Sequence, residues 1–169
     1  MAWRESVGAD PPRRYLGERY WARPLPGFGD AGARVLVVGL APAAHGGNRT
    51  GRIFTGDRSG DWLFASLHRT GFANQPTSER PGDGLQLRGA RIAAVVRCAP
   101  PANRPTTVER DNCLPYLARE LRLLTDARVL VALGSFAWDG VLLALRANGI
   151  ASPRPKPRCD TTVHAFQGL

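Results

Sequence analysis

Three apolar runs along the chain predict buried strands, at residues 34–38, 91–96 and 128–133. Each run is followed by a helical pattern of apolar positions, at residues 62–67, 106–125 and 134–149. The second helical pattern opens on a capping-box signature, Thr106 with Glu109 three residues later. Strand, loop and helix repeated in this order predict an α/β fold, with right-handed crossovers and a parallel central sheet covered on both faces.

The pattern weakens at both ends of the chain. Residues 1–30 are rich in charge, aromatic residues and proline, so we expect an irregular arm that packs on the domain through its aromatic side chains: Trp3, Tyr15, Tyr20 and Trp21. Residues 151–169 contain too little apolar sequence for a further strand and helix. Since a sheet of three strands would be small, we expect its last strand to be missing.

One stretch, residues 39–61, directly follows the first predicted strand and holds an unusual set of side chains. Six glycines let its backbone approach a ligand closely, and polar residues and one phenylalanine lie between them. A second loop, residues 97–105, leaves the next strand at the same edge of the sheet. Ligands bind at the carboxyl ends of strands in open α/β sheets, so we expect the active site here.

The net charge is +9, from 23 basic and 14 acidic residues, which suits a polyanionic partner such as nucleic acid. Only one basic residue is a lysine, and an arginine-rich composition with much alanine, glycine and proline is also typical of a GC-rich genome. The chain has no apolar run of about 18 residues, so we expect no membrane span and a cytoplasmic protein. Three scattered cysteines do not form the framework of a secreted disulfide protein.

Two nucleotide-binding motifs fail in the long loop. A P-loop requires Lys and Ser or Thr where Arg52 and Ile53 stand, and no strand is followed by the dinucleotide fingerprint. Chemistry on a flipped base fits better, because it needs an aromatic face, backbone donors and a group that places a water molecule. Phe54 offers the face, Asp57 a carboxylate for the water, and Asn103 a hydrogen bond from the neighbouring loop.

Residues 39–57 resemble the first motif of the family 5 (type b) uracil-DNA glycosylases, and residues 94–106 resemble that family's second conserved block. Residues 3–5 and 20–30 are similar to its N-terminal region. The resemblance implies a three-layer α/β/α sandwich at residues 1–157, incomplete, with a divergent tail at 158–169. It implies a monomeric bacterial or archaeal repair enzyme that removes uracil, and some other deaminated bases, from DNA and leaves an abasic site.

The resemblance also implies roles for residues, and each role has a structural alternative. Asp57 matches the catalytic acid, because alanines stand where related families place an acidic or amide residue, but an N-cap would also explain Asp57. Phe54 matches the aromatic residue on which the base stacks, and the alternative is that it is an ordinary core residue. Asn103 and His45 are catalytic candidates; the alternatives are that Asn103 is a turn residue and that His45 only hydrogen-bonds the loop backbone. The candidate substrate contacts are Gly39, Ala41, Pro42, Ala43, Asn48 and Phe54, and the candidate phosphate contacts are Arg49, Arg52, Arg97 and Arg104.

The family holds a [4Fe–4S] cluster on four cysteines, and Cys98 and Cys113 match the second pair of these metal ligands. The first pair and a His-Pro-Ser-type loop have no match in the chain, so we expect it to be truncated at both ends and a poor cluster binder. Two alternatives to an active glycosylase stay open. One is a remnant of such an enzyme that binds DNA through the four arginines without cleaving the glycosidic bond, and the other is the product of a broken gene that folds poorly.

Overall fold

The central sheet is mixed and open in the part of the chain that the structure, a computed structural model, describes: residues 2–151, 156, 158–160 and 164–165. Its strands lie in the order β1-β3-β2-β4. Their bounds are Phe28–Gly29 for β1, Val35–Gly39 for β2, Ala90–Ala94 for β3 and Val129–Ala132 for β4. The three predicted strands are present, and β2 is parallel to β3 on one side and to β4 on the other. The prediction that they are buried is wrong for β4, because this strand lies at the edge of the sheet and its residues are exposed or half-buried.

The short strand β1 was not predicted. It pairs antiparallel with β3, through Phe28 opposite Ile92 and Gly29 opposite Arg91. Two residues are too few to produce an alternating pattern, and the prolines and glycines before them indicate a turn instead. Gly29 has a φ of 124°, a conformation that only glycine adopts readily, so the strand ends there.

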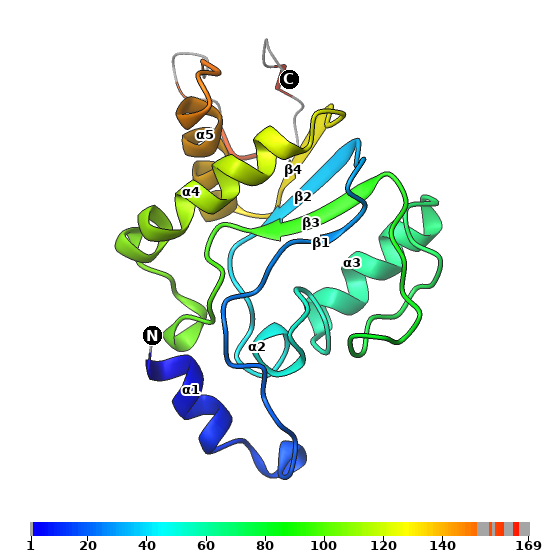
Figure 1. Cartoon of the computed structure of the whole chain (residues 1–169), viewed down its shortest axis with the longest axis vertical. Coiled ribbons are helices and arrows are strands. Elements are labelled where there is room, and N and C mark those ends of the chain that lie inside the picture. The colour runs from blue at the N-terminus through cyan, green and yellow to red at the C-terminus, as the bar shows by residue number, and fades with distance from the viewer. Residues whose placement is uncertain (1, 152–155, 157, 161–163, 166–169) are drawn as a thin grey trace.

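The helices cover both faces of the sheet, as Figure 1 shows. One face carries α3 (Arg58–Arg69), and the other carries α4 (Thr107–Leu123) and α5 (Ser135–Ala147). The predicted capping box is confirmed, because Thr106 and Glu109 each accept a hydrogen bond from the other's backbone N–H at the start of α4. Shorter elements are α1 (Ala2–Ala9), α2 (Gly47–Thr50) and the 3-10 turns η1 (Arg13–Tyr15) and η2 (Pro101–Asn103).

Alternation along β2 divides the core into two clusters. Leu36 and Val38 face α4 and α5, where Leu117, Val141 and Leu145 are buried. Val37 faces the opposite side, where Ile92, Phe64 and Leu67 are buried with leucines from the 70–89 segment. Successive side chains of a strand point to opposite faces, so one central strand supplies both cores and the three-layer α/β/α arrangement is confirmed.

The prediction of an irregular N-terminal arm is wrong for residues 2–9, which form α1. This helix has only eight residues, too few for a clear periodicity, and a tertiary contact holds it: Arg4 Nε donates to the carbonyl oxygen of Ala22 at 2.8 Å. The predicted aromatic packing is seen at Tyr20, which is buried, and at Tyr15, whose ring stacks on His45.

The far edge of the sheet is formed by β4. Val129 and Val131 on this strand are exposed, as is Leu133 after it. That a further strand is missing here stays a prediction. So does the boundary between a domain at 1–157 and a tail at 158–169, which falls at a residue outside the described ones. No described helix is both long and apolar enough to cross a membrane.

Candidate active site

A cavity of about 660 Å³ opens at the carboxyl ends of β2, β3 and β4. Gly39 is the last residue of β2, Asn103 lies in the loop that follows β3, and Leu133 directly follows β4. The lining comprises Gly39, Leu40, Ala41, Ala43, Phe54, Ser59, Trp62, Leu63, Ser66, Asn103 and Leu133. Five residues that the sequence predicted as catalytic or substrate-binding are therefore brought together: Gly39, Ala41, Ala43, Phe54 and Asn103.

The aromatic wall of this cavity is the ring of Phe54, which lies against Gly39. A Cβ atom at Gly39 would stand only 2.6 Å from Cζ of Phe54 and 2.7 Å from Cε2. On the other side, Gly60 in the first turn of α3 packs against the Phe54 carbonyl, leaving no room for a side chain there. Glycine at both positions is what lets the phenylalanine loop fit between strand and helix.

The backbone of Phe54 is strained, with a φ of 53°. A non-glycine residue in this left-handed region costs about 1–3 kcal/mol and persists only where its surroundings hold it. A buried network does so on both sides of the loop: Arg52 Nε donates to Thr55 Oγ1 at 2.9 Å, and Thr55 Oγ1 lies 2.7 Å from Ser78 Oγ. The strain and the network together present the ring to the cavity.

Asp83 completes this network with two hydrogen bonds from the Arg52 guanidinium, at 3.0 and 2.6 Å. The pair is well shielded, with exposed fractions of 6% for the arginine side chain and 10% for the aspartate. Burial alone would raise the pKa of Asp83. The bonds from Arg52 and from the backbone N–H groups of Glu79, Leu85 and Arg80 outweigh burial, and they hold the pKa far below its ordinary value. The carboxylate therefore stays charged and anchors the Phe54 loop.

Asp57 caps α3 and does not line the cavity. Its Oδ1 accepts a hydrogen bond from the Gly60 N–H at 3.0 Å, as an N-cap does. Its second oxygen, Oδ2, packs against Gly46, where a side chain would have no space. The structural alternative for Asp57 is thus present in the fold, and its carboxylate also contacts the long loop after β2.

Asn103 lies at the exposed end of η2 and lines the cavity. It and its neighbour Ala102 both have positive φ angles, 54° and 51°. Asparagine tolerates the left-handed conformation better than other residues with a side chain, and alanine does not. This second strained loop places Asn103 at the same cavity as Phe54.

His45 and Asn48 point away from the cavity toward the N-terminal segment. The Tyr20 hydroxyl and His45 Nδ1 are hydrogen-bonded at 2.8 Å. Burial lowers the pKa of His45, and the charges of Arg14 and Arg49 lower it further, so the ring is neutral near pH 7. Asn48 is fully buried and its Nδ2 donates to the Arg4 carbonyl oxygen at 3.1 Å. Pro42, also buried, packs against Gly47 in the same loop.

The four arginines predicted to contact phosphates differ in how free they are. Three make ion pairs within the protein: Arg49 with Glu18 at 2.6 Å, Arg52 with Asp83 at 2.6 Å, and Arg97 with Glu120 at 2.8 Å. Arg104, on the loop after β3, is exposed and has no ion-pair partner among the described residues. Their contact with DNA stays a prediction.

Cys98 and Cys113 are both buried, whereas Cys159 is exposed. Burial raises the pKa of the Cys98 thiol, although the nearby Arg4 guanidinium, whose Nη1 lies 3.0 Å from Sγ, lowers it. A [4Fe–4S] cluster needs four thiolate ligands. Within the described residues no group of three or more His, Cys, Asp and Glu side chains could hold a metal ion, so the residues present do not fit such a cluster.

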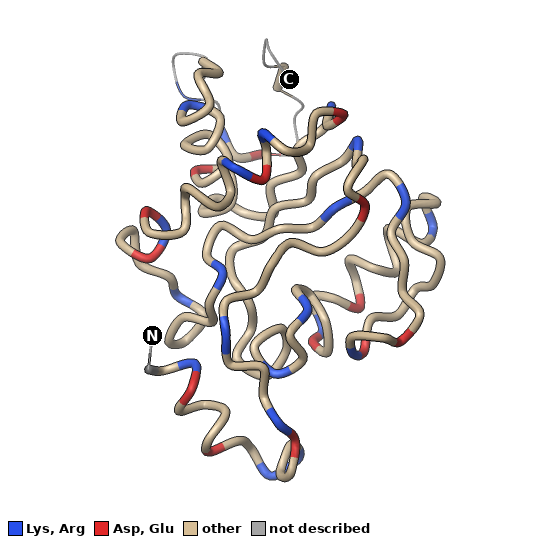
Figure 2. The backbone as a smooth tube through the Cα atoms, in the orientation of Figure 1, with Lys and Arg blue, Asp and Glu red and all other residues tan. Residues whose placement is uncertain are grey.

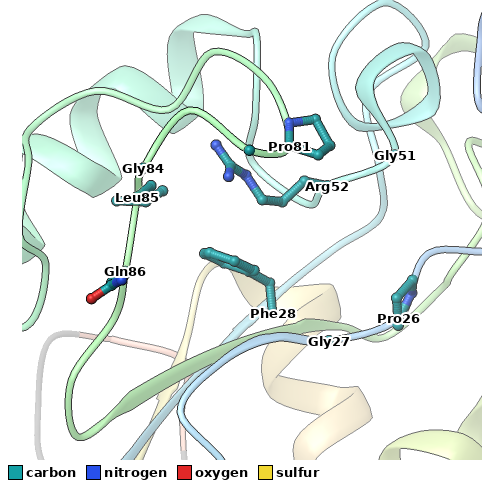
Figure 3. A pocket seen from close by; sticks show the side chains of 10 residues that line it. Pro26, Gly27, Phe28, Gly51, Arg52, Pro81, Gly84, Leu85 and Gln86 are labelled. Carbon is teal, nitrogen blue, oxygen red and sulfur yellow. The ribbon is translucent and has the colours of Figure 1, made fainter.

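A second cavity, of about 410 Å³, lies at the β1 edge of the sheet and shares only Arg52 with the predicted site. Figure 3 shows the Arg52 side chain between Pro81 and Phe28, and its guanidinium carbon is 4.9 Å from the centre of the Phe28 ring. Because that guanidinium is already paired with Asp83, its charge is neutralised at this cavity.

The sequence did not reveal Trp62, which is 66% exposed and lines the main cavity from α3. We read Trp62 as part of an apolar helix face with Phe64 and Leu67, but only these two are buried. A signal was available, because residues 62, 63 and 64 are consecutive apolar positions and cannot all lie on one face of a helix. Leu133, at the end of β4, was missed because its exposure depends on the open sheet edge.

Comparisons with known proteins find relatives along most of the chain. The family model of the Uracil DNA glycosylase superfamily matches residues 26–165. A Type-5 uracil-DNA glycosylase from Mycobacterium bovis is 54% identical over 94% of this chain and 58% of its own length. Proteins of the same name from Mycobacterium leprae and Thermus thermophilus are each 53% identical, over 92% and 84% of this chain and 67% and 64% of their own lengths. The chain thus spans little more than half of the Mycobacterium bovis relative.

Proposed function

The chain belongs to the Uracil DNA glycosylase superfamily, with the type-5 enzymes as relatives, and we propose that it removes uracil from DNA by hydrolysing the N-glycosidic bond. The resemblance noted in the sequence is thereby confirmed. The observation that carries the proposal is the cavity of about 660 Å³ at the carboxyl ends of the parallel strands, which both Phe54 and Asn103 line. Such a cavity accepts one flipped base.

In the proposed reaction, uracil enters the cavity and stacks on Phe54. The bond between N1 of uracil and C1′ of the sugar breaks, and its electron pair leaves with the base. A water molecule adds to C1′ of the oxocarbenium-like sugar, and its proton goes to the departing base. Free uracil and an abasic site result.

The described residues offer a role at each stage of that reaction. Backbone N–H groups of the loop after β2, which runs from Gly39 through Ala43 along the cavity, would stabilise negative charge on the leaving base. Asn103 would hold the water through its side-chain amide. Asp57, kept beside Gly46 by its cap of α3, would favour positive charge on the sugar. His45 is neutral near pH 7 and supports the loop through Tyr20.

Two further features belong to the proposal. The substrate would be uracil-containing DNA, and the protein would act on it as a monomer in the cytoplasm of a bacterial or archaeal cell. No step passes through an iron–sulfur cluster, because Cys98 and Cys113 supply two of the four thiolates that a cluster requires.

A strand-cleavage assay tests the proposal. A labelled duplex with one uracil opposite guanine is incubated with excess protein in a buffer that contains EDTA. Alkali is then added, which cleaves the DNA strand at abasic sites. We expect a break at the uracil and none in the matched duplex with thymine opposite adenine. An intact strand with measurable DNA binding would favour the remnant that binds without cleaving.

A further inference from the structure

The arginines that form ion pairs within the protein do not account for its positive net charge, so other basic residues are the candidates for DNA contacts. Three arginines are in ion pairs that neutralise at least part of their charge: Arg49 with Glu18, Arg52 with Asp83, and Arg97 with Glu120. The net charge is nevertheless +9. Other guanidinium groups must therefore face solvent, and Figure 2 shows basic positions along the N-terminal segment that runs past α2.

A pocket of about 300 Å³ lies between this segment and α2, and we call it the N-terminal pocket. It is lined by Arg19, Tyr20, Trp21, Arg23, Arg49 and Thr50. Two backbone hydrogen bonds fix its walls together: Trp21 N–H donates to the Arg49 carbonyl at 3.0 Å, and Ala22 N–H to the Asn48 carbonyl at 3.1 Å. The pocket is thus built by paired segments of backbone.

Arg19 and Arg23 are the free charges of this pocket. Both are exposed, and neither has an ion-pair partner in the part of the chain that the structure describes. Arg49, the third arginine, is held by Glu18 at 2.6 Å and lies over the Tyr15 ring. The pocket therefore presents two unpaired guanidinium groups, which suit a phosphate.

Trp21 adds an aromatic surface to these charges. Its indole N–H donates to the Pro24 carbonyl at 3.4 Å, and its ring rests on Gly51, where a Cβ would stand 3.0 Å from Cδ2 of the indole. The side chain is still 44% exposed, and the Arg23 guanidinium lies 5.8 Å from its ring. A fixed, exposed indole beside free arginines is a combination typical of surfaces that bind nucleic acid.

We propose that the N-terminal pocket binds a phosphodiester of the DNA backbone, through Arg19 and Arg23, with Trp21 against the adjoining nucleotide. This inference rests on the proposed function, since it takes DNA as the ligand. The pocket and the cavity share one loop: Gly39, Leu40, Ala41 and Ala43 line the cavity, and Arg49 and Thr50 line the pocket. Figure 1 shows α2, which carries Arg49 and Thr50, on the side where β2 and β3 end. The pocket and the cavity are thus joined through this one loop.

Fluorescence anisotropy with a uracil-free duplex tests the inference without any chemistry. The double variant Arg19→Gln/Arg23→Gln is compared with Arg119→Gln/Arg122→Gln, which removes the same charge from exposed positions on the C-terminal half of α4. We expect the pocket variant to bind at least 5-fold more weakly than the control at low salt. The slope of its log affinity against log salt should become less steep by about 0.9, since the pocket contacts one phosphate and each phosphate contact contributes about 0.9. Arg19→Lys/Arg23→Lys should restore most of the slope.

Equal effects of the two glutamine pairs would overturn the inference, because net charge alone would then explain binding. Inorganic phosphate provides a second arm. If a few millimolar phosphate displaces DNA more strongly than chloride at equal ionic strength, the pocket binds small anions, and the backbone assignment is wrong. We expect no such difference.

Uracil excision, measured in the same proteins at saturating concentration, separates the two proposals. If the pocket variant excises uracil normally and binds DNA as the wild type does, the pocket inference is wrong and the proposed function stands. If the pocket variant binds DNA more weakly and none of the proteins excises uracil, the pocket inference stands and the proposed function is wrong.

Discussion

The Phe54 ring lies against Gly39, with room for a hydrogen atom at that glycine but not for a methyl group. This contact joins the end of the central strand β2 to the aromatic wall of the cavity. Because the φ of Gly39 does not lie in the left-handed region, an alanine there would act through the ring and not through the backbone. The pair therefore offers a direct way to move Phe54 by a single added carbon.

Gly39→Ala should displace the Phe54 ring and slow uracil excision by about 100-fold, since a misplacement of about 1 Å costs this much in an oriented site. Single-turnover excision rates measure the effect. Gly32→Ala is the matched control, because the nearest atom to its Cβ would be 3.7 Å away. Normal excision by Gly39→Ala would show that the position of the ring is unimportant.

Phe54→Leu should retain the fold but lose the stacking face. Stacking of a base on an aromatic ring contributes about 1–3 kcal/mol, so excision should slow by about 5- to 150-fold. Stability should change by less than about 1.5 kcal/mol, as for other swaps between apolar residues. Phe72→Leu, in the same apolar cluster but outside the cavity, should leave excision unchanged. Equal loss in both variants would indicate packing instead of stacking.

Much of this architecture follows from local sequence. The runs at 34–38 and 91–96 are strands because β-branched and other apolar residues at the centre of the sheet are buried on both faces. The run at 128–133 also contains a strand, although that strand lies at the sheet edge and its residues are exposed or half-buried. The cavity could be placed because loops after parallel strands meet at one edge. Gly39, Phe54 and Asn103, from two such loops, do line it.

Features that depend on distant partners could not be predicted. Asp83 and Glu120 determine whether Arg52 and Arg97 are free, and they lie 31 and 23 residues further along the chain. No local pattern reports such a pairing. The strained φ of Phe54 is also tertiary in origin, because the network of Arg52, Thr55 and Ser78 imposes it.

Asp83→Asn should lower the free energy of unfolding by about 3 kcal/mol at pH 7, since it leaves the buried Arg52 without a charged partner. The Asp83 pKa is lowered in the folded state, so its contribution is complete above the unfolded value of about 3.9 and is lost as the pH falls below it. Urea unfolding at pH 7 and at pH 3 should show the difference from wild type shrinking. Asp126→Asn, at an exposed position, should show neither effect. If the difference in free energy of unfolding between wild type and Asp83→Asn were the same at both pH values, it would contradict the stabilising role of the Arg52–Asp83 ion pair.

His45 should titrate below the ordinary histidine value of about 6.5, because burial and the charges of Arg14 and Arg49 disfavour its protonated form. Nuclear magnetic resonance of the imidazole protons measures the midpoint, and loss of the signal in His45→Gln assigns it. By linkage, the part of the stability that comes from neutral His45 is present above about pH 6.5 and declines below it. A midpoint above 6.5 would show that the ring is charged and would change its proposed role.

Release of the base itself tests the central claim most directly. The protein is mixed in excess with a duplex that contains one uracil, and free uracil is quantified by mass spectrometry together with alkali-sensitive sites. We expect one free uracil for each abasic site formed, and we expect both Asn103→Ala and Phe54→Leu to reduce the rate of excision. Intact uracil-containing DNA after prolonged incubation, in a protein that is folded and binds the duplex, would contradict the central claim.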